Sequence, residues 1–276
     1  MSQEDDHPRA VRYVPAHRIS TGSTGTPPVE ESVGVALEGT VTIEIDGIGS
    51  YTVLCVPDDK RAMVLGFLYS EGIIDAASDV AFLEQSEVYP GVMQVRLAGN
   101  VSRSRTHESS RLILSSCGAC GSEGIDSKLK AIREVDDTLR VDGSVLPAVR
   151  DSLRENQRLF KACGGTHAVA IFDDAGVILA AAEDTGRHNA LDKAIGKCLL
   201  AGVPTERRGA ALSGRVSVEM VGKCARAGIE LITAISAPTS LAIEVAERCN
   251  ITLCAFVRET RATVFTHPRR IVTTDR

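Results

Sequence analysis

The sequence predicts an α/β fold in which a helix-covered C-terminal sheet follows a smaller, β-rich N-terminal α+β domain. Two patterns predict this fold. From His167 onward, short apolar strands alternate with helical stretches, as in mainly parallel sheets with helices packed on them. Before about residue 160, segments that alternate apolar and polar residues indicate half-exposed strands. We therefore expect a flexible N-terminal arm at 1–32, a β-rich domain at 33–160 and an α/β domain at 161–276.

The β-rich domain is preceded by a segment without hydrophobic periodicity. That segment contains STGSTGTPP, a composition typical of flexible or loosely docked chain. TVTIEI at 40–45 then alternates apolar and polar residues, and Asp46-Gly47 predicts a turn before a second strand at 51–56. A helix follows, with Asp58 as its expected N-cap and Gly72 at its end. Two further strands are expected at 93–97 and 111–116.

The C-terminal domain is predicted to begin with a hairpin, in which HAVAIF and VILAAA flank DDAG. A helix over 144–160 leads into it, with Ser144 as its N-cap and Pro147 in its first turn. Three alternations of strand and helix follow the hairpin. Their strands are expected at 209–213, 231–235 and 251–256, and the helices at 188–201, up to Gly228 and up to Asn250.

Composition limits the classes of function. The chain has 276 residues, of which 43% are hydrophobic and 24% charged, as in soluble globular proteins. A net charge of -5 and an aromatic content of 4%, without tryptophan, argue against a nucleic-acid-binding surface. No apolar run could span a membrane, and MSQEDDHPRA lacks the apolar core of a secretory signal. We therefore expect a cytoplasmic protein that binds neither nucleic acid nor membrane.

Polar and glycine-rich segments follow each predicted strand of the C-terminal sheet. Ligands of open α/β sheets bind at the carboxyl ends of the strands, and Gly or Ser at a helix start offers free amides to phosphate. Most such caps bind nothing, but several of them converging on one edge predict a phosphorylated or nucleotide-containing ligand. The candidate binding residues at these ends are Ser213, Gly214, Arg215, Ser236, Thr239, Arg258, Arg261 and His188.

Three nearby polar residues have simpler interpretations. His167, at the start of a strand, is as compatible with a structural role as with a functional one. Asp192 and Lys193, inside the helix that His188 opens, are interpreted as solvated surface charges.

Only Cys117 and Cys120, in CGACG, form a close pair among the eight cysteines. The other six are expected to be reduced thiols, mostly in the core. A zinc site would need two further ligands at a spacing that the sequence does not show, so no metal site is predicted. Two interpretations of the pair stay open, a dithiol redox motif and an exposed nucleophilic thiol in a glycine-rich loop.

Several motifs together resemble one family, the FdhD formate dehydrogenase accessory sulfurtransferases. The resemblance runs in order over about residues 35–272. The EDTGRHNALDK block is the most specific part. The motifs are GFLYSEGII, SSCGACG, GGTHAVAIF, EDTGRHNALDKAIG, SGRVSVEMVGK, SAPTSLAIEVAE and FVRETRATVFTHPRRI.

The resemblance implies a sulfurtransferase. Cys117 would accept sulfur from a cysteine desulfurase as a persulfide, with Cys120 as an auxiliary or resolving thiol. The sulfur would pass to the bis-guanine-dinucleotide form of the molybdenum cofactor before its insertion into formate dehydrogenase or a related molybdoenzyme. The family's cofactor-binding stretch corresponds here to Phe256, Val257, Arg258, Glu259, Thr260 and Arg261.

The resemblance also implies a homodimer and a three-layer C-terminal domain similar to the cytidine deaminase fold. The deaminase zinc signature is absent from this sequence, so deamination is not expected. Two other functions stay open on chemistry alone. One is a non-catalytic chaperone that binds the molybdenum cofactor, and the other is a thiol-disulfide oxidoreductase that needs both Cys117 and Cys120.

Overall fold

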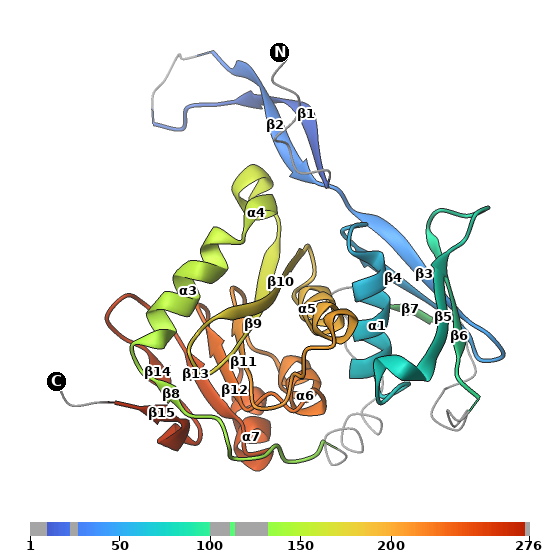
Figure 1. Cartoon of the computed structure of the whole chain (residues 1–276). Coiled ribbons are helices and arrows are strands. Elements are labelled where there is room, and N and C mark those ends of the chain that lie inside the picture. The colour runs from blue at the N-terminus through green and yellow to red at the C-terminus, as the bar shows by residue number, and fades with distance from the viewer. Residues whose placement is uncertain (1–9, 23–26, 100–110, 114–131, 274–276) are drawn as a thin grey trace, which may run out of the picture.

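The computed structural model describes residues 10–22, 27–99, 111–113 and 132–273. Two sheets form two lobes on either side of a packed pair of helices, and a narrow hairpin extends from the top of the molecule (Figure 1). Within the described residues, no helix is long and apolar enough to cross a lipid bilayer.

The N-terminal lobe is a five-stranded sheet with one helix packed against it. Its strand order is β5-β6-β3-β4-β7, with β3 antiparallel to β4, β6 parallel to β3, and β7 parallel to β4. The predicted alternation is visible in β3, where Val41, Ile43 and Ile45 are buried in the core. The elements are β3 Gly39–Ile45, β4 Gly49–Cys55, α1 Lys60–Ser70, β5 Val80–Gln85, β6 Val92–Leu97 and β7 Arg111–Ile113.

The C-terminal lobe is built on a six-stranded sheet of order β10-β9-β11-β12-β13-β14. The central strands β11, β12 and β13 are parallel, while the outer pairings are antiparallel. The expectation of a mainly parallel sheet is therefore wrong, because the β9–β10 hairpin joins the sheet directly beside β11. The strands are β9 His167–Phe172, β10 Ile178–Asp184, β11 Gly209–Leu212, β12 Leu231–Ala234, β13 Thr252–Ala255 and β14 Thr263–Val264.

Helices cover both faces of this sheet and give three layers. One face packs on α5, α6 and α7 in the larger hydrophobic core, and the other face packs on α3. Short apolar side chains allow close packing on both faces, with Ala210 and Ala211 of β11 facing opposite cores. The helices are α3 Val145–Glu155, α5 Arg187–Ala201, α6 Val218–Arg226 and α7 Ser240–Arg248.

The predicted helix over 144–160 differs in the structure. It ends at Glu155, and a short second helix, α4 (Arg158–Cys163), follows. The Ser144 hydroxyl bonds Asp142 at 2.5 Å instead of capping α3. Although it precedes residue 160, α3 packs on the C-terminal sheet.

The structure also differs from the expectation of a flexible arm at 1–32. β1 (Val11–Arg18) and β2 (Val29–Ala36) form a two-stranded antiparallel sheet, which is the hairpin at the top of Figure 1. The hairpin packs on α4, where a Cβ at Gly34 would lie 2.5 Å from the carbonyl oxygen of Ala162. Contact with a helix thus orders a segment whose own sequence predicts little order.

The two lobes meet where α1 lies against α5, side by side between the two sheets (Figure 1). Glycine makes this contact possible. A Cβ at Gly66 of α1 would lie 1.7 Å from the carbonyl oxygen of Asp192, and one at Gly196 of α5 would lie 1.8 Å from that of Ala62. The two backbones therefore touch, and any side chain at either glycine would separate the helices.

Buried ion pairs flank the helix contact. Lys193 is fully buried and binds Asp184 at 3.0 Å and Asp58 at 2.5 Å. Asp192, 2% exposed, accepts hydrogen bonds from Lys223 at 2.8 Å and Ser70 at 2.7 Å. The interpretation of Asp192 and Lys193 as solvated charges is therefore wrong, and so is that of Asp58 as the helix cap, because all three join the lobes.

Lys193 is charged in this setting. Burial alone would lower the pKa of its ammonium group, but the carboxylates of Asp184 and Asp58 outweigh that effect and raise the pKa. Its ammonium also donates to the carbonyl oxygen of Val56 at 2.9 Å. Removing one partner of such a buried pair leaves an uncompensated charge, which is strongly destabilising.

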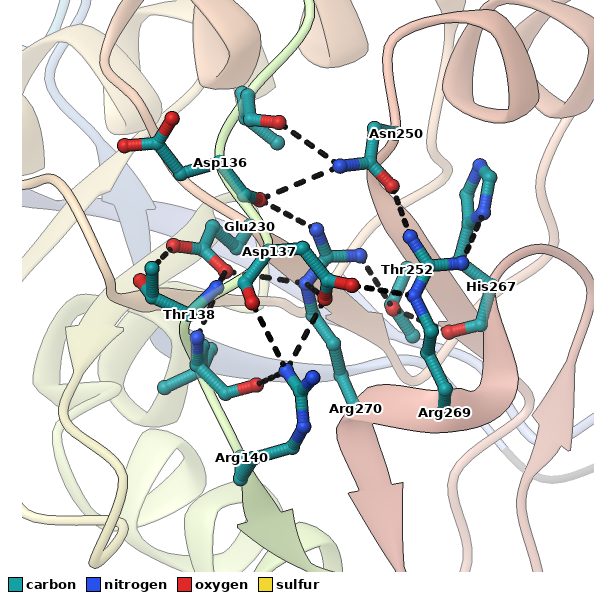
Figure 2. Close-up of polar contacts among 12 residues, drawn as sticks. Asp136, Asp137, Thr138, Arg140, Glu230, Asn250, Thr252, His267, Arg269 and Arg270 are labelled. Atoms are coloured by element: carbon teal, nitrogen blue, oxygen red, sulfur yellow. Dashed lines mark hydrogen bonds and ion pairs between the residues drawn. The ribbon is translucent and has the colours of Figure 1, made fainter.

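A third buried ion pair fastens the C-terminal segment (Figure 2). Arg270 is fully buried, and its guanidinium binds Glu230 at 3.1 Å, Thr252 at 3.2 Å and the carbonyl oxygen of Asp136 at 2.5 Å. Burial opposes ionisation of Glu230, but hydrogen bonds from Thr138, the Leu139 amide and Arg270 outweigh it and lower its pKa. The network joins the chain after residue 132 to the amino-terminal ends of β12 and β13.

The contact between α1 and α5 predicts that adding a single methyl group at Gly66 will strongly destabilise the fold. Gly66→Ala should lower the free energy of unfolding by about 3 kcal/mol, because the new Cβ cannot fit without moving α1 away from α5. Denaturant unfolding measures this change. Gly222→Ala in α6 is the matched control. Its Cβ would meet only Ile132 at 3.4 Å, so it should be neutral or stabilising. Equal effects at the two sites would contradict the account.

Candidate functional site

The topology brings the predicted strand-end segments to one edge of the C-terminal sheet. β11, β12 and β13 are parallel, so the loops that follow them leave from the same edge. β9 runs antiparallel to β11 and pairs with β10, which places His167 and Asp184 opposite each other at that edge. The predicted convergence of these segments is confirmed. We call this region the strand-end site; it comprises His167, Asp184 to Asn189, Ser213 to Ser217, Ile235 to Ser240 and Phe256 to Arg261.

Backbone hydrogen bonds join the loops of the strand-end site. The amide of Val216 donates to Ala237 at 3.1 Å, and the amide of Thr239 donates back to Val216 at 3.0 Å. The amides of Phe256 and Val257 donate to Ser236 at 3.4 Å and Ala234 at 3.1 Å. Each loop is thus held in place by hydrogen bonds to its neighbour. The backbone that carries the outward-pointing side chains of these loops is therefore well positioned.

The loop after β11 uses two of its predicted residues for local structure. The Ser213 hydroxyl accepts a hydrogen bond from the amide of Ala168 at 2.8 Å. At Gly214, a Cβ would lie 2.9 Å from Nδ1 of His167, so glycine allows the imidazole ring to pack against the loop. Arg215, the next residue, is exposed.

The loop after β12 also uses a predicted residue for local structure. Thr239 accepts a hydrogen bond from the amide of Ala242 at 3.3 Å and caps α7, while Ser236 is half-buried. The simpler interpretation of a threonine at a helix start, as a cap, is therefore realised at Thr239.

The loop after β13 presents most of its predicted residues outward. Arg258, Glu259, Thr260 and Arg261 are exposed, and Phe256 is 39% exposed with a left-handed backbone at φ 54°.

Two residues of the same loop are fixed by their surroundings. The guanidinium of Arg258 donates to the carbonyl oxygens of Ile235 at 2.8 Å and Val257 at 2.9 Å, which holds it beside β12. The Val257 side chain is buried in the core, so only its backbone could face a ligand.

His188 takes part in a small polar cluster at the start of α5 and α6. Its Nε2 lies 3.1 Å from a carboxylate oxygen of Glu219 and 3.3 Å from the hydroxyl of Ser217. Ser217 donates to the same carboxylate at 3.0 Å. The hydrogen bond from His188 outweighs partial burial and lowers the pKa of Glu219 to about 2, so this carboxylate is ionised at neutral pH.

Sequence reasoning missed several residues of the EDTGRHNALDK block that act inside the protein. Asp184 is fully buried and accepts from the amide of Val56 at 3.0 Å and the amide of Gly186 at 2.9 Å. Asn189 donates to Asp184 at 2.9 Å and to the carbonyl oxygen of Leu54 at 2.8 Å. The sequence feature that could have revealed these residues was the polar run between a strand and an apolar helix. The partners of Asp184 and Asn189 in the N-terminal lobe, Val56 and Leu54, lie about 130 positions away in the chain.

The cysteine pair lies outside the described residues, since Cys117 and Cys120 fall within 114–131. The chain on either side of that range is placed. Before it, β7 pairs with β4, and after it Ile132 packs on the larger core. The prediction that Cys117 is a nucleophilic thiol stays a prediction.

Five of the other six cysteines are poor nucleophiles. These five are buried as predicted, and burial raises the pKa of each of their thiols, to about 12 for Cys55 and about 11 for both Cys198 and Cys254. Cys163 is half-buried, and its thiol donates to the carbonyl oxygen of Leu159 at 3.0 Å.

Metal-binding residues do not gather anywhere in the part of the chain that the structure describes. No group of three or more His, Cys, Asp or Glu side chains there is arranged to hold a metal ion.

Comparison with known proteins agrees on one family. The sequence model of the FdhD/NarQ family matches residues 36–272. The sulfur carrier protein FdhD of Bordetella bronchiseptica is 38% identical over 243 residues, 87% of this chain and 88% of that protein. That of Thermoplasma acidophilum is 36% identical over 250 residues, 88% of this chain and 89% of that protein.

A solved structure shares the fold. It is the crystal structure of a Desulfotalea psychrophila protein assigned as a formate dehydrogenase accessory protein, with a TM-score of 0.75 and 24% sequence identity. The alignment covers 95% of this chain and all of that one.

The polar cluster predicts a measurable pKa change. In His188→Gln the pKa of Glu219 should rise from about 2 toward the usual carboxyl value, because the hydrogen bond from the imidazole is its largest cause. Carbon NMR titration of the Glu219 carboxyl group measures it. His267→Gln, which removes a histidine at the opposite edge of the sheet, should leave the Glu219 pKa unchanged. An unchanged pKa in His188→Gln would show that the cluster does not form.

Proposed function

Because the chain belongs to the FdhD/NarQ family, we propose that it is a sulfur carrier that supplies a formate dehydrogenase. The relatives from Bordetella bronchiseptica and Thermoplasma acidophilum, which match over almost nine-tenths of the chain, are both called sulfur carrier proteins. The match to relatives so named is the single observation that carries the proposal.

The sulfur is carried as a persulfide on Cys117. The thiolate of Cys117 attacks the outer sulfur of a persulfide on a cysteine desulfurase. A new sulfur–sulfur bond forms at Cys117, the desulfurase's own sulfur–sulfur bond breaks, and its cysteine leaves as a thiolate. One sulfur atom moves and no net oxidation occurs. Support comes from the SSCGACG motif and from the raised pKa of the five buried thiols.

Cys120 serves as an auxiliary or resolving thiol. Its position three residues after Cys117 would allow it to attack the Cys117 persulfide and release the outer sulfur as sulfide. The two residues would then be left as a disulfide. Efficient delivery therefore requires that the acceptor take the sulfur before Cys120 does.

The acceptor in this proposal is the molybdenum cofactor in its bis-guanine-dinucleotide form, bound as a substrate at the strand-end site. Its phosphates would lie against Arg215, Arg258 and Arg261, three guanidiniums on or beside adjacent loops. The exposed ring of Phe256 offers a face for a planar ring system. The remaining residues contribute backbone or smaller polar groups; they are Ser213, Gly214, Ser236, Thr239, Val257, Glu259, Thr260 and His188.

The partners follow from the reaction. A cysteine desulfurase donates the sulfur, and the loaded cofactor passes to a formate dehydrogenase or a related molybdoenzyme. We expect the carrier to act in the cytoplasm, as its composition and sequence suggest, and as a homodimer, as its resemblance to the family implies.

Intact-mass spectrometry tests the sulfur-carrier role. The full chain is incubated with a cysteine desulfurase and free cysteine, then compared with Cys117→Ser and Cys163→Ser. Wild type and Cys163→Ser should gain the mass of one sulfur atom, which a reductant removes, and Cys117→Ser should gain none.

Other outcomes would favour the other functions. No added sulfur in wild type, or an equal gain in Cys117→Ser, would overturn the proposal in favour of a chaperone that only binds the cofactor. A Cys117–Cys120 disulfide of defined potential, with activity that needs both cysteines, would indicate a thiol-disulfide oxidoreductase.

A further inference from the structure

Four basic side chains from three elements gather at the strand-end site. Arg187 and His188 open α5, Arg215 lies in the loop after β11, and His167 begins β9. Arg187 and Arg215 lie near enough to His167 for their charges to act on its imidazole. A positive cluster assembled from three elements is a feature of the fold and not of one helix end.

The nearby carboxylates are engaged elsewhere. Glu219 accepts hydrogen bonds from Ser217 and binds His188 at 3.1 Å. Asp184 binds the buried ammonium of Lys193 at 3.0 Å as well as two backbone amides. Neither carboxylate is therefore free to neutralise two guanidiniums, and the cluster keeps an excess of positive charge.

Arg187 has a buried donor in need of an acceptor. Its Nε is shielded from solvent and has no hydrogen-bond partner among the described residues. Buried donors of this kind are rare. Leaving a charged donor buried without a hydrogen bond costs more free energy than a typical hydrogen bond contributes to stability. An anionic ligand at this position would supply that acceptor.

The start of α6 adds to the positive field. Ser217 is the N-cap residue of this nine-residue helix, but its side chain does not cap the first turn and donates to Glu219 instead. Helix amino-terminal ends carry partial positive charge and attract anions. Gly214, next to Arg215, lies against the His167 ring, since a Cβ there would be 2.9 Å from Nδ1 of His167.

We propose that Arg187, Arg215 and His167 form an oxyanion subsite that holds one phosphate group of the bound substrate. The two guanidinium forks match the geometry of phosphate oxygens, and Arg187 gains the acceptor that its Nε lacks. The proposal rests on the proposed function only for the identity of the substrate. The assignment of Arg187 and His167 to binding comes from the described contacts.

The subsite links binding to a proton. In the free protein, burial and the charges of Arg187, Arg215 and His188 lower the pKa of His167, and only Asp184 acts in the opposite direction. His167 is therefore neutral at pH 7. A bound oxyanion would favour the imidazolium and raise this pKa. Proton uptake would accompany binding, so affinity should increase as the pH falls from the pKa of the bound state toward the lower pKa of the free state.

Calorimetric titration with inorganic pyrophosphate tests the subsite in the full chain. Arg187→Gln should weaken pyrophosphate binding about tenfold or more, because charge-assisted hydrogen bonds are lost. Arg187→Lys, which keeps the charge without the fork, should lose less. Arg158→Gln is the matched control, since Arg158 also opens a helix and lies outside the strand-end site. It should bind like wild type.

A second variant and a second measurement test the subsite independently of any misfolding of Arg187→Gln. Arg215 is exposed, so Arg215→Gln should fold normally and show the same loss of affinity. NMR titration of the His167 ring should give a higher pKa with saturating sulfate, whose charge is constant in this range, than without it. Wild-type affinity in both glutamine variants, no pyrophosphate binding by wild type, or an unchanged His167 pKa would overturn the subsite.

Failure of the subsite is distinguishable from failure of the sulfur-carrier role. Arg187→Gln should still gain one sulfur atom from a cysteine desulfurase, because the chemistry at Cys117 does not use this residue. Normal sulfur loading with normal pyrophosphate binding in Arg187→Gln would remove the subsite alone. Loss of loading in wild type would remove the proposed function and leave the subsite to be judged on pyrophosphate alone.

Discussion

The contact between α1 and α5 is the constraint on which both lobes depend. Two glycines let the helix backbones touch, and the flanking charges of Asp192 and Lys193 are buried by that approach. Each of these charges is matched by a partner from elsewhere in the chain, Lys223 for Asp192 and Asp184 with Asp58 for Lys193. A buried charge without its partner would be severely destabilising, so the lobes can hold only the arrangement in which all the pairs form.

This constraint also positions the strand-end site. Asp184, at the end of β10, forms an ion pair with Lys193 and accepts hydrogen bonds from the amides of Val56 and Gly186. These contacts join the turn into α5 to the N-terminal lobe. Arg187 and His188 follow in the same turn. At the opposite edge of the sheet, Arg270 and Glu230 fasten the segment that follows residue 132 (Figure 2). Structural charges and the proposed binding charges thus occupy neighbouring positions of one motif.

Most of the fold was predictable from local patterns, whereas long-range pairing was not. Alternation identified the strands, and the order of strands and helices predicted that their loops meet at one edge. The charges of Asp192 and Lys193 looked solvated because Lys223 and Asp58, which bind them, are about 30 and 135 residues distant in the chain, and no local pattern shows these pairings. The β1–β2 hairpin was missed for a similar reason, since α4, which it packs on, lies far along the chain.

The central claim is that sulfur on Cys117 is needed by a formate dehydrogenase. The most direct measurement uses a bacterial strain that lacks its own family member and makes a molybdenum formate dehydrogenase. Its formate-oxidising activity and the cyanide-labile sulfur of the purified enzyme are measured with wild type, Cys117→Ser and Cys163→Ser. The account predicts both properties with wild type and Cys163→Ser, and neither with Cys117→Ser. Full activity with Cys117→Ser would contradict it.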